Sequence, residues 1–506
     1  MTWTRFAPES GRSSSPCWGD EVIVYAVDLG TTNVKVVRYD DSGRTQAVAR
    51  QPMHYLRDGD RVVFDPASVF DAVVDLIHRC AADVGGPRDD AIIVVTGQAE
   101  SLVLVDAAGR LLGPGISWMD ERSTVQAREM VEAFDPVEAF ARSGEPEPAA
   151  TWPATKLRWL TAHRPDVMAE ARGVHMIKDY VLRRLTGVTV GEETTRGFTY
   201  FYDVPARAYW PEMVDFCGIR MDMLPKLVPA GTQIGLVLDE VADTLPAAAS
   251  YSVNVGALDH FCAMAGTGTY SPGAVSASAG TVLALSVLAA DWRFDPSMKV
   301  SFHAGLRAGD TVLFSCADSG GVSLSWFQEN IATGPSYDAL ERELSERGHG
   351  SEPLFLPYLT GVNPPDFNHA ARGAFIDLQL RHDRVDLAYA VMEGVSHLLR
   401  RNLDDLSGHD QPVRSVTSAG GGTASAFWNQ LKADVTGIEL RVPQEREDAC
   451  RGAAILALAA AGVIDSITDT AALHEPTVHT YRPRTDPSRR LRYDAFDAAL
   501  RRLYGP

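Results

Sequence analysis

The residues with the clearest chemical potential lie near the start of the chain, where an apolar run ends on the carboxylate of Asp28. Gly30 follows, and because glycine has no Cβ, the backbone there can turn tightly and approach a ligand closely. The hydroxyls of Thr31 and Thr32, with nearby N–H groups, suit phosphate oxygens, and Asp28 is placed to hold a divalent cation through water. The pattern predicts a phosphate-binding turn that is not a Walker loop, whereas the plainer interpretation is a hairpin with a polar turn.

The elements predicted around this turn are three strands, a helix and a fourth strand. The turn joins two β-rich runs, and residues 45–50 can return as a third strand. Asp65 and Pro66 are typical of a helix start, with an N-cap carboxylate followed by proline at the first helical position. Apolar residues at helical spacing continue to Cys80, and residues 91–95 are expected to form a buried strand.

A similar order of elements recurs far downstream. Residues 274–279 and 282–287 flank Gly280 and Thr281, which form a second Gly–Thr hairpin. Further strands and helices follow, and one short strand enters a glycine run at 420–422. Two copies of one β-rich α/β unit, each with a Gly–Thr hairpin facing a shared cleft, would grip phosphates from both sides. Duplication is therefore the main architectural inference from the residues themselves.

Composition excludes several classes of partner. The 506 residues provide room for two or three domains. Lys and Arg number 47 against 66 Asp and Glu, a formal net charge of −19, and no basic stripe is present, so a nucleic-acid partner is not expected. No apolar stretch reaches membrane-spanning length, so no membrane association is expected either.

The cysteines and the first residues indicate the compartment. Six cysteines are scattered without metal-ligand spacing, and most have apolar neighbours, as small core residues do in a reducing compartment. Residues 1–20 are rich in Ser, Pro and Gly and contain no apolar core typical of a signal peptide. We therefore expect a disordered tail at 1–20 and a cytoplasmic protein.

Further polar motifs follow the first turn along the chain. They occupy residues 97–106, 116–122, 177–187, 256–260 and 420–430. In this order, and with the 28–32 motif in front, the chain closely resembles the FGGY family of carbohydrate kinases. The resemblance runs from about residue 25 to about residue 481, and xylulokinase-like members are the most similar.

The resemblance implies an α/β fold with two actin-like (ribonuclease-H-like) ATPase domains around a central cleft. Beyond the tail, an N-terminal domain at 21–258 would carry the sugar side and the first phosphate hairpin. A C-terminal domain at 259–484 would carry the ATP side, and residues 485–506 would form a helical extension.

Asp259 is the catalytic residue that the resemblance implies. It lies at the position of the family's catalytic base, and a carboxylate there can accept the proton of a sugar hydroxyl as that oxygen attacks phosphorus. A helix N-cap is the alternative interpretation of Asp259. The next residue, His260, could orient the base or be structural.

The resemblance also implies a site for ATP and Mg²⁺. Asp28 matches a role at the metal, the glycine run matches the adenosine motif, and Ser425 matches a polar contact to adenine or ribose, although such a run is by itself a common strand-to-helix loop. The implied residues are Asp28, Gly30, Thr31, Thr32, Gly280, Thr281, Gly421, Gly422 and Ser425.

Substrate contacts are expected from two of the motifs. Asp120 can accept from adjacent hydroxyls, and the indole face of Trp118 can pack against the C–H surface of a sugar. The full expected set is Gln98, Glu100, Trp118, Asp120, Arg122 and Asp259.

The chain departs from xylulokinases at these motifs. Gln98-Ala99-Glu100 stands where xylulokinases usually carry Gln-Met-His, and Glu100 is similar to the glutamate of glycerol kinases. Met119 and Glu121 replace the usual Asn and Gln, and residues 361–365 lack the charges of the usual Gly-Glu-Arg-Thr-Pro loop.

Two further charged segments are interpreted as structural. Lys178 and Asp179 are expected to make a helix contact of the fold rather than a catalytic pair. Residues 445–448, a run of charges, are expected to form a solvated approach to a helix.

The leading hypothesis is an ATP- and Mg²⁺-dependent kinase of a small ketose, with a pentulose such as xylulose as the first candidate. A polyol kinase acting on glycerol, erythritol or a pentitol is the alternative within the class. A non-catalytic actin-fold protein that binds nucleotide and sugar is the alternative outside it. The sequence is compatible with a homodimer but does not determine the oligomeric state.

Overall fold

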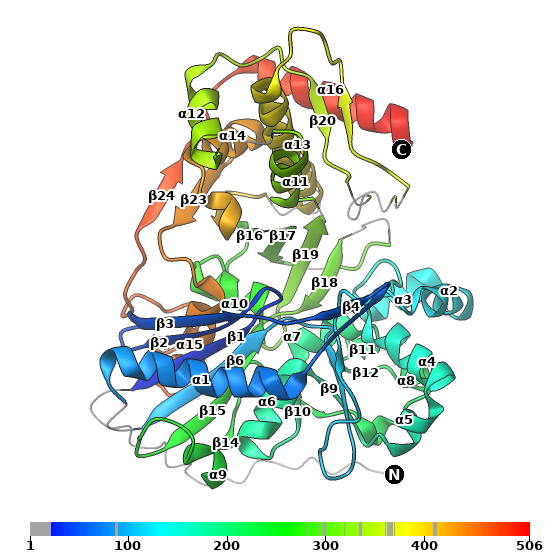
Figure 1. Cartoon of the computed structure of the whole chain (residues 1–506), viewed down its shortest axis with the longest axis vertical. Coiled ribbons are helices and arrows are strands. Elements are labelled where there is room, and N and C mark those ends of the chain that lie inside the picture. Colours follow the sequence, from blue (N-terminus) through cyan, green and yellow to red (C-terminus); the bar gives the residue numbers. More distant parts are fainter. Residues whose placement is uncertain are drawn as a thin grey trace.

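The computed structural model describes residues 22–86, 90–280, 282–291, 293–296, 300–317, 319–332, 336–359, 361, 368, 370–407 and 412–505. The expected tail at 1–20, Thr281 and residues 362–365 of the altered loop lie outside the described residues. Figure 1 shows two lobes, each built around one β-sheet, with helices α10 and α15 close to the junction between them.

The first lobe contains a six-stranded sheet in the order β14-β15-β6-β1-β2-β3. β1, β2 and β3 are antiparallel neighbours, whereas β1, β6 and β15 run parallel. Its strands are β1 (Ile23–Leu29), β2 (Asn33–Tyr39), β3 (Thr45–Pro52), β6 (Ala91–Gly97), β14 (Gln233–Leu236) and β15 (Tyr251–Leu258).

The second lobe contains a seven-stranded sheet in the order β18-β19-β17-β16-β22-β23-β24. β16, β17 and β19 are antiparallel neighbours, whereas β16, β22 and β23 run parallel. Its strands are β16 (Ala274–Ala279), β17 (Leu283–Leu288), β18 (Ser301–Ala304), β19 (Thr311–Ala317), β22 (Ser415–Ala419), β23 (Glu439–Pro443) and β24 (Val478–Tyr481).

The two sheets confirm the predicted duplication. The run β3-β2-β1-β6-β15 in one sheet has the same pattern as β19-β17-β16-β22-β23 in the other: three antiparallel strands followed by two parallel ones. In the first copy, Gly30 and Thr31 lie between β1 and β2; in the second copy, Gly280 lies between β16 and β17.

Helices cover both faces of the first sheet, and its central strands are therefore buried on both sides. α1 (Pro66–Val84) and α6 (Ile177–Thr186) pack on one face through a core that includes Tyr25 and Val27. α10 (Asp259–Gly266) and α15 (Asp448–Ala460) pack on the other through a core that includes Val24. The same core contains residues of β17 and β19, so α10 lies between the two sheets.

The second lobe is completed by helices on the outer side of its sheet. α13 and α16 share a core with β16, β17 and β22. The helices and the small hairpin of this lobe are α11 (Val322–Asn330), α12 (Tyr337–Glu346), α13 (Arg384–Ser407), α14 (Ala426–Thr436), α16 (Pro487–Tyr504), η3 (Gly421–Thr423), β20 (Leu354–Leu356) and β21 (Ala374–Ile376).

A side subdomain extends the first lobe. Its five-stranded sheet has the order β4-β5-β8-β7-β9. These strands are β4 (Leu56–Asp58), β5 (Arg61–Phe64), β7 (Leu102–Val105), β8 (Gly115–Ile116) and β9 (Gly173–Met176). The other elements of this lobe are α2 (Thr124–Ala133), α3 (Pro136–Ser143), α4 (Pro153–His163), α5 (Pro165–Glu170), α7 (Glu193–Arg196), α8 (Pro211–Cys217), α9 (Asp239–Ala242), β10 (Val190–Glu192), β11 (Tyr202–Asp203), β12 (Ala208–Tyr209), β13 (Lys226–Val228), η1 (Gly197–Thr199) and η2 (Met221–Met223).

Among the helices of the described ranges, none combines the length and the apolarity that crossing a membrane requires.

Candidate active site

Asp28 lies in β1 and is almost fully buried. Its Oδ2 atom is 3.0 Å from the Lys35 ammonium, whereas its Oδ1 atom is buried and has no hydrogen-bond partner in the described structure. Burial raises the pKa of Asp28, Lys35 opposes this shift, and the nearby charge of Asp259 adds to it. Asp28 therefore has one free carboxylate oxygen in a carboxylate-rich environment.

This free oxygen suits a hydrated magnesium ion. Mg²⁺ usually keeps several waters and takes only one or two protein carboxylates, together with phosphate oxygens of the substrate. Within the described residues, no group of three or more His, Cys, Asp and Glu side chains could form an all-protein metal cage. A site that uses Asp28 with water and phosphate is compatible with both facts.

Lys35 connects Asp28 to the second half of the chain. Its ammonium also lies 3.2 Å from Glu447, which in turn pairs with Arg50 at 3.2 Å. Asp448 next to it is buried, and burial raises its pKa to about 7. The interpretation of residues 445–448 as a solvated run was therefore wrong for Glu447, which pairs with Lys35 of β2 and Arg50 of β3, and for Asp448, which is buried.

The turn after Asp28 is shaped by close packing. A Cβ on Gly30 would lie 3.0 Å from the carbonyl oxygen of Asn33, which is tighter than most side chains allow. Thr32 is exposed, and the Thr31 hydroxyl accepts a hydrogen bond of 3.0 Å from the indole N–H of Trp118. The turn expected to bind phosphate and the motif expected to bind sugar therefore touch each other.

Asp259 is the first residue of α10, directly after β15. Leu258 holds the N-cap position, and Oδ1 of Asp259 accepts from the adjacent N–H of His260 at 2.7 Å, so the side chain does not cap the next turn. The side chain is half-buried, and the charge of Asp259 raises the pKa of both Asp28 and Glu100. These three carboxylates therefore lie in one neighbourhood at the start of α10.

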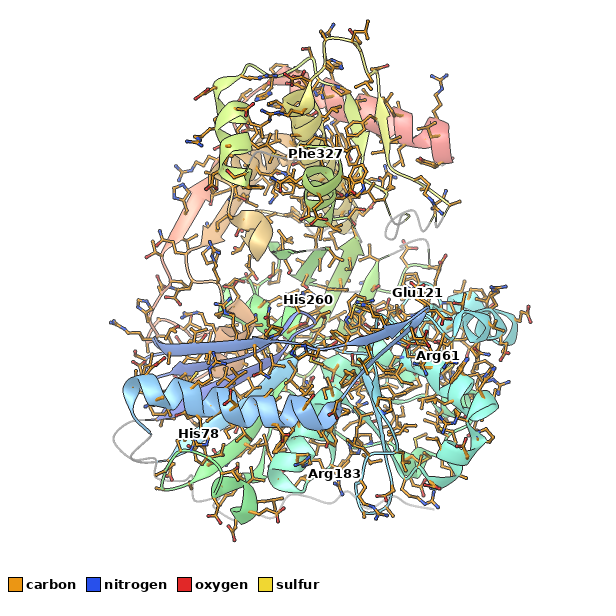
Figure 2. All side chains as sticks on the ribbon, in the orientation of Figure 1. Arg61, His78, Glu121, Arg183, His260 and Phe327 are labelled. Atoms are coloured by element: carbon orange, nitrogen blue, oxygen red, sulfur yellow. The ribbon has the colours of Figure 1, made fainter. Side chains whose placement is uncertain are left out.

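The position of His260, the residue after Asp259, shows where these three carboxylates lie in the molecule. Figure 2 shows His260 at the level where the two lobes meet, and its ring centroid lies 5.3 Å from that of Phe314 on β19 of the second sheet. Asp259 therefore belongs to the segment that joins the lobes rather than to an outer surface.

Glu100 adopts an unusual backbone conformation beside Asp259. Its φ is +67°, a value that non-glycine residues rarely adopt and that is common at functional sites. Burial raises the pKa of Glu100 to about 8, which Lys156 opposes and Glu145 and Asp259 reinforce. None of the described residues donates a hydrogen bond to its carboxylate, so a ligand hydroxyl could use these oxygens.

Gln98 is buried between the first turn and the side subdomain. Its amide nitrogen lies 3.5 Å from the carbonyl oxygen of Gly30 and from the Tyr55 hydroxyl, and its amide oxygen accepts from Ser101 at 2.9 Å. The bonds from nitrogen are long, which leaves donor capacity for a ligand.

Lys156 belongs to the same neighbourhood, although sequence reasoning did not identify it. Its ammonium is fully buried and donates to the carbonyl oxygens of Trp118 at 3.2 Å and Thr151 at 2.6 Å. Burial lowers the pKa of Lys156 to about 7, and Glu100 and Asp120 oppose this shift. An ammonium has three donors, so one remains for a ligand. The sequence signal that could have identified Lys156 is a lysine among the apolar residues of α4, in a chain whose basic residues are mostly arginine.

Asp120 already has hydrogen-bond partners within the protein. It is fully buried; Arg122 donates to both of its oxygens, at 2.7 and 2.6 Å, and the N–H of Val62 donates to Oδ2 at 2.6 Å. Arg122 in turn lies over the ring of Trp159 at 5.1 Å. In this structure Asp120 holds Arg122 and β5 in place, and its direct contact with a substrate stays a prediction.

On the second lobe, the Gly280 turn and the glycine run meet. A Cβ on Gly422 would lie 2.8 Å from the carbonyl oxygen of Ala279, so η3 lies directly against the end of β16. Gly420 has a φ of +91°, which favours glycine. The positions of a Cβ on Gly280 and Gly421 are open, which leaves space beside the backbone for a ligand.

Ser425 is used within the protein, because its hydroxyl caps α14 by accepting from the N–H of Trp428 at 3.0 Å and donates to Glu341 at 2.7 Å. Two side chains of α14 hold the glycine run in place. Lys432 donates to the carbonyl oxygen of Gly422 at 3.0 Å, and Asn429 donates to that of Thr423 at 2.8 Å. The expected contact of Ser425 with adenine or ribose stays a prediction, and its bonds in this structure position the loop.

Comparison with known proteins identifies the class. The model of the FGGY family of carbohydrate kinases, N-terminal domain, matches residues 23–266, and that of the C-terminal domain matches residues 311–461. The chain belongs to the FGGY family of carbohydrate kinases. It is an ATP-dependent sugar kinase, a phosphotransferase whose acceptor is an alcohol group.

Individual relatives carry more than one substrate name. A gluconokinase of Bacillus subtilis is 27% identical over 456 residues, which are 87% of this chain and 88% of the relative. A xylulose kinase of the same organism is 26% identical over 457 residues, 88% of this chain and 90% of the relative. The structure of a ligand-bound xylulose kinase from Lactobacillus acidophilus has a TM-score of 0.88 at 23% identity and covers 96% of this chain and 99% of its own, which shows the fold.

Proposed function

We propose that this kinase transfers the γ-phosphoryl group of ATP to a hydroxyl of a small neutral ketose, with a pentulose such as xylulose as the first candidate, and that Asp259 is the general base. The observation that carries the proposal is the position of Asp259 at the start of α10, within electrostatic reach of both Asp28 and Glu100. Asp259 is thus close both to Asp28, which is proposed to act at the phosphates, and to Glu100, which is proposed to bind the sugar.

In the proposed reaction, Asp259 accepts the proton of the sugar hydroxyl as its oxygen attacks the γ-phosphorus, and the bond from phosphorus to the ADP oxygen breaks. An unshared carboxylate oxygen is required, and Oδ2 of Asp259 accepts no hydrogen bond from the described residues.

Asp28 would hold Mg²⁺ through water with its free Oδ1 atom. When bound, the ion offsets the negative charge of the phosphates during transfer. Thr31 and Thr32 would donate to the phosphates from the first lobe, Gly280 and Thr281 would approach them from the second, and Gly421 and Gly422 would leave the nucleotide space against the backbone.

The charge around Glu100 supports a neutral acceptor. Asp259 and Glu145 both raise the pKa of Glu100, and Lys156 is the cation that opposes them. A substrate carboxylate placed here would meet the nearby carboxylates of Asp259 and Glu145, and this repulsion costs binding free energy. We therefore infer a ketose rather than an aldonate, although the relative from Bacillus subtilis reported above is named a gluconokinase.

On the sugar side, Glu100 would accept from hydroxyls, Gln98 and Lys156 would donate to them, and the Trp118 indole would cover a C–H face. Asp120 and Arg122, which form an ion pair with each other, would contact the sugar at the edge of this group of side chains.

A polyol is the second candidate, and a specific observation favours it. No donor to the Glu100 carboxyl is present among the described residues, and such a group can accept from two adjacent hydroxyls of glycerol, erythritol or a pentitol. Ketose and polyol differ by one carbonyl, which the donors Gln98 and Lys156 would recognise.

The test is a panel of acceptors with the purified enzyme, in which ADP release is measured with ATP and Mg²⁺. The acceptors are xylulose, ribulose, glycerol, erythritol, xylitol and gluconate. Turnover that is fastest with a pentulose supports the proposal. Turnover with polyols alone would replace the ketose by the second candidate, and turnover with gluconate alone would contradict the argument from charge.

A panel without any turnover, together with binding of both ATP and a sugar, would favour a non-catalytic relative. We further propose a cytoplasmic location, in keeping with a metabolic kinase of small sugars. Sedimentation of the purified protein tests the homodimer with which the sequence is compatible.

A further inference from the structure

The strand that leads to Asp259 contains an irregularity at its last residues. β15 pairs with β6 in register up to Val255 opposite Val95, and the next pair joins Leu258 to Gly97. Three steps along β15 therefore match two along β6, which is a bulge at Gly256 and Ala257. Bulges re-aim the residues that follow them and are common beside active sites.

Three side chains from three elements hold this bulge. Thr96 of β6 donates to the carbonyl oxygen of Ala257 at 2.7 Å, and Lys178 of α6 donates to that of Gly256 at 2.6 Å. Thr194 of α7 accepts from the N–H of Leu258 at 2.8 Å. Every residue between the regular ladder and Asp259 is thus fixed by a buried polar group.

Two of these side chains are joined by Glu192. Its Oε2 atom accepts from Lys178 at 3.0 Å and from the Thr194 hydroxyl at 2.8 Å, and its Oε1 atom accepts from the Thr194 N–H at 2.7 Å. A hydroxyl has one proton, and Thr194 gives it to Glu192, so the oxygen lone pairs are directed to Leu258. We call Lys178, Glu192 and Thr194 the Lys178 network.

The Lys178 network is fully buried, with at most 1% of each residue exposed. A buried ion pair contributes little net stability, because the desolvation of both charges offsets their attraction. Its fixed directions matter more than its energy here, since it grips the backbone on both sides of Ala257. Lys178 and Asp179 were expected to make a helix contact of the fold, and each has a buried partner within the first lobe: Lys178 pairs with Glu192, and Asp179 pairs with Arg196.

We propose that the Lys178 network is a positioning unit that aims the carboxylate of Asp259 at the acceptor hydroxyl. The proposal rests on the proposed function, in which Asp259 is the general base. Its residues do not touch the reacting atoms; they act through the backbone of residues 256–258. Loss of one hydrogen bond should move the base and lower the rate of the chemical step, while the binding of sugar and nucleotide is kept.

Thr194→Val is the decisive variant, because it keeps the size of the side chain and removes the hydroxyl. Thr195→Val is the matched control: Thr195 is the next residue of α7, is equally buried and bonds to Glu192, but makes no bond to residues 256–258 in the described structure. We expect kcat to fall by roughly 10- to 100-fold in Thr194→Val, since small misplacements have effects of this size. KM for sugar and ATP should change little, Thr195→Val should keep kcat, and Thr194→Ser should restore most of it.

A double variant separates positioning from a general loss of structure. If Thr194 acts through Asp259, adding Thr194→Val to Asp259→Asn should cause no further loss of kcat, because the base is already absent. Additive losses, or an unchanged kcat in Thr194→Val, would overturn the proposal. An unchanged kcat in Asp259→Asn alone would instead overturn the proposed function. If Thr194→Val does not fold, Thr194→Cys enters the same comparison.

Discussion

The indole N–H of Trp118 donates to the hydroxyl of Thr31 at 3.0 Å, and this bond joins the two halves of the proposed reaction. Thr31 belongs to the turn expected to bind phosphate, whereas Trp118 belongs to the motif expected to bind sugar. A single hydrogen bond thus makes the position of one side depend on the other.

The first prediction concerns this bond. Trp118→Phe keeps an aromatic face and removes the N–H, and Thr31→Val removes the acceptor. We expect each to lower kcat/KM for the sugar about tenfold, the size of one net hydrogen bond. The double variant should be little worse than either single one, because both remove the same bond. Trp326→Phe on α11 is the control, and fully additive losses would contradict the coupling.

The second prediction concerns the pH dependence of stability at Glu100. Its folded pKa of about 8 lies above the ordinary value of 4.5, so the folded protein binds the proton more tightly than the unfolded chain. Ionisation of Glu100 therefore costs stability as the pH rises from about 4.5 to about 8. Glu100→Gln cannot ionise, so its Tm relative to that of the natural enzyme should increase across this range and stay constant above it. A pH-independent difference in Tm would contradict the buried carboxyl.

The third prediction concerns the metal. Asp28→Asn keeps the shape of the side chain and removes its charge, and we expect the Mg²⁺ concentration for half-maximal activity to rise on the order of tenfold or more. Asp40→Asn is the control, since the Asp40 carboxylate accepts from Ser42 and from the Arg44 N–H in the turn after β2. An unchanged Mg²⁺ dependence in Asp28→Asn would remove Asp28 from the metal site.

The fourth prediction concerns the contact between α10 and α15. A Cβ on Gly452 would lie 1.7 Å from the carbonyl oxygen of Cys262, and one on Gly266 would lie 2.0 Å from that of Asp448. The helices must therefore move apart in Gly452→Ala, and we expect a loss of roughly 1–3 kcal/mol or more in unfolding free energy. Gly348→Ala, at an open position, should have little effect in the same urea titrations. Equal stability of the two variants would contradict the close helix contact.

The order of elements was predictable because hydrophobic periodicity and turn residues are local signals. The two Gly–Thr turns, the helix that begins at Pro66 and the strand at 91–97 all follow from patterns within about ten residues. The duplicated strand order was predictable from the same local signals, because the same series of strands and turns recurs later in the chain.

The partners of buried charges could not be predicted, because they are far apart along the chain. Lys35 and Glu447 meet only because α15 returns to the first sheet, and Lys178 meets Gly256 across the same lobe. Periodicity shows that a position is buried, but not which polar group faces it. Lys156 was missed for this reason.

Asp120 illustrates a different limit. The resemblance to carbohydrate kinases implied that Asp120 accepts from sugar hydroxyls, and this contact stays a prediction. The sequence did not indicate that Arg122, two residues later, donates to both carboxylate oxygens. Local sequence gives the residue types but not the backbone path that decides whether a carboxylate is already satisfied.

The most direct test of the account is the turnover number of Asp259→Asn, measured with the best acceptor of the panel. Because the variant keeps the side-chain shape but cannot accept the proton, we predict a fall in kcat of about a thousandfold or more, with an unchanged Tm and unchanged binding of sugar and nucleotide. A kcat within a few-fold of the natural enzyme would contradict the assignment of the base and, with it, the mechanism proposed for this kinase.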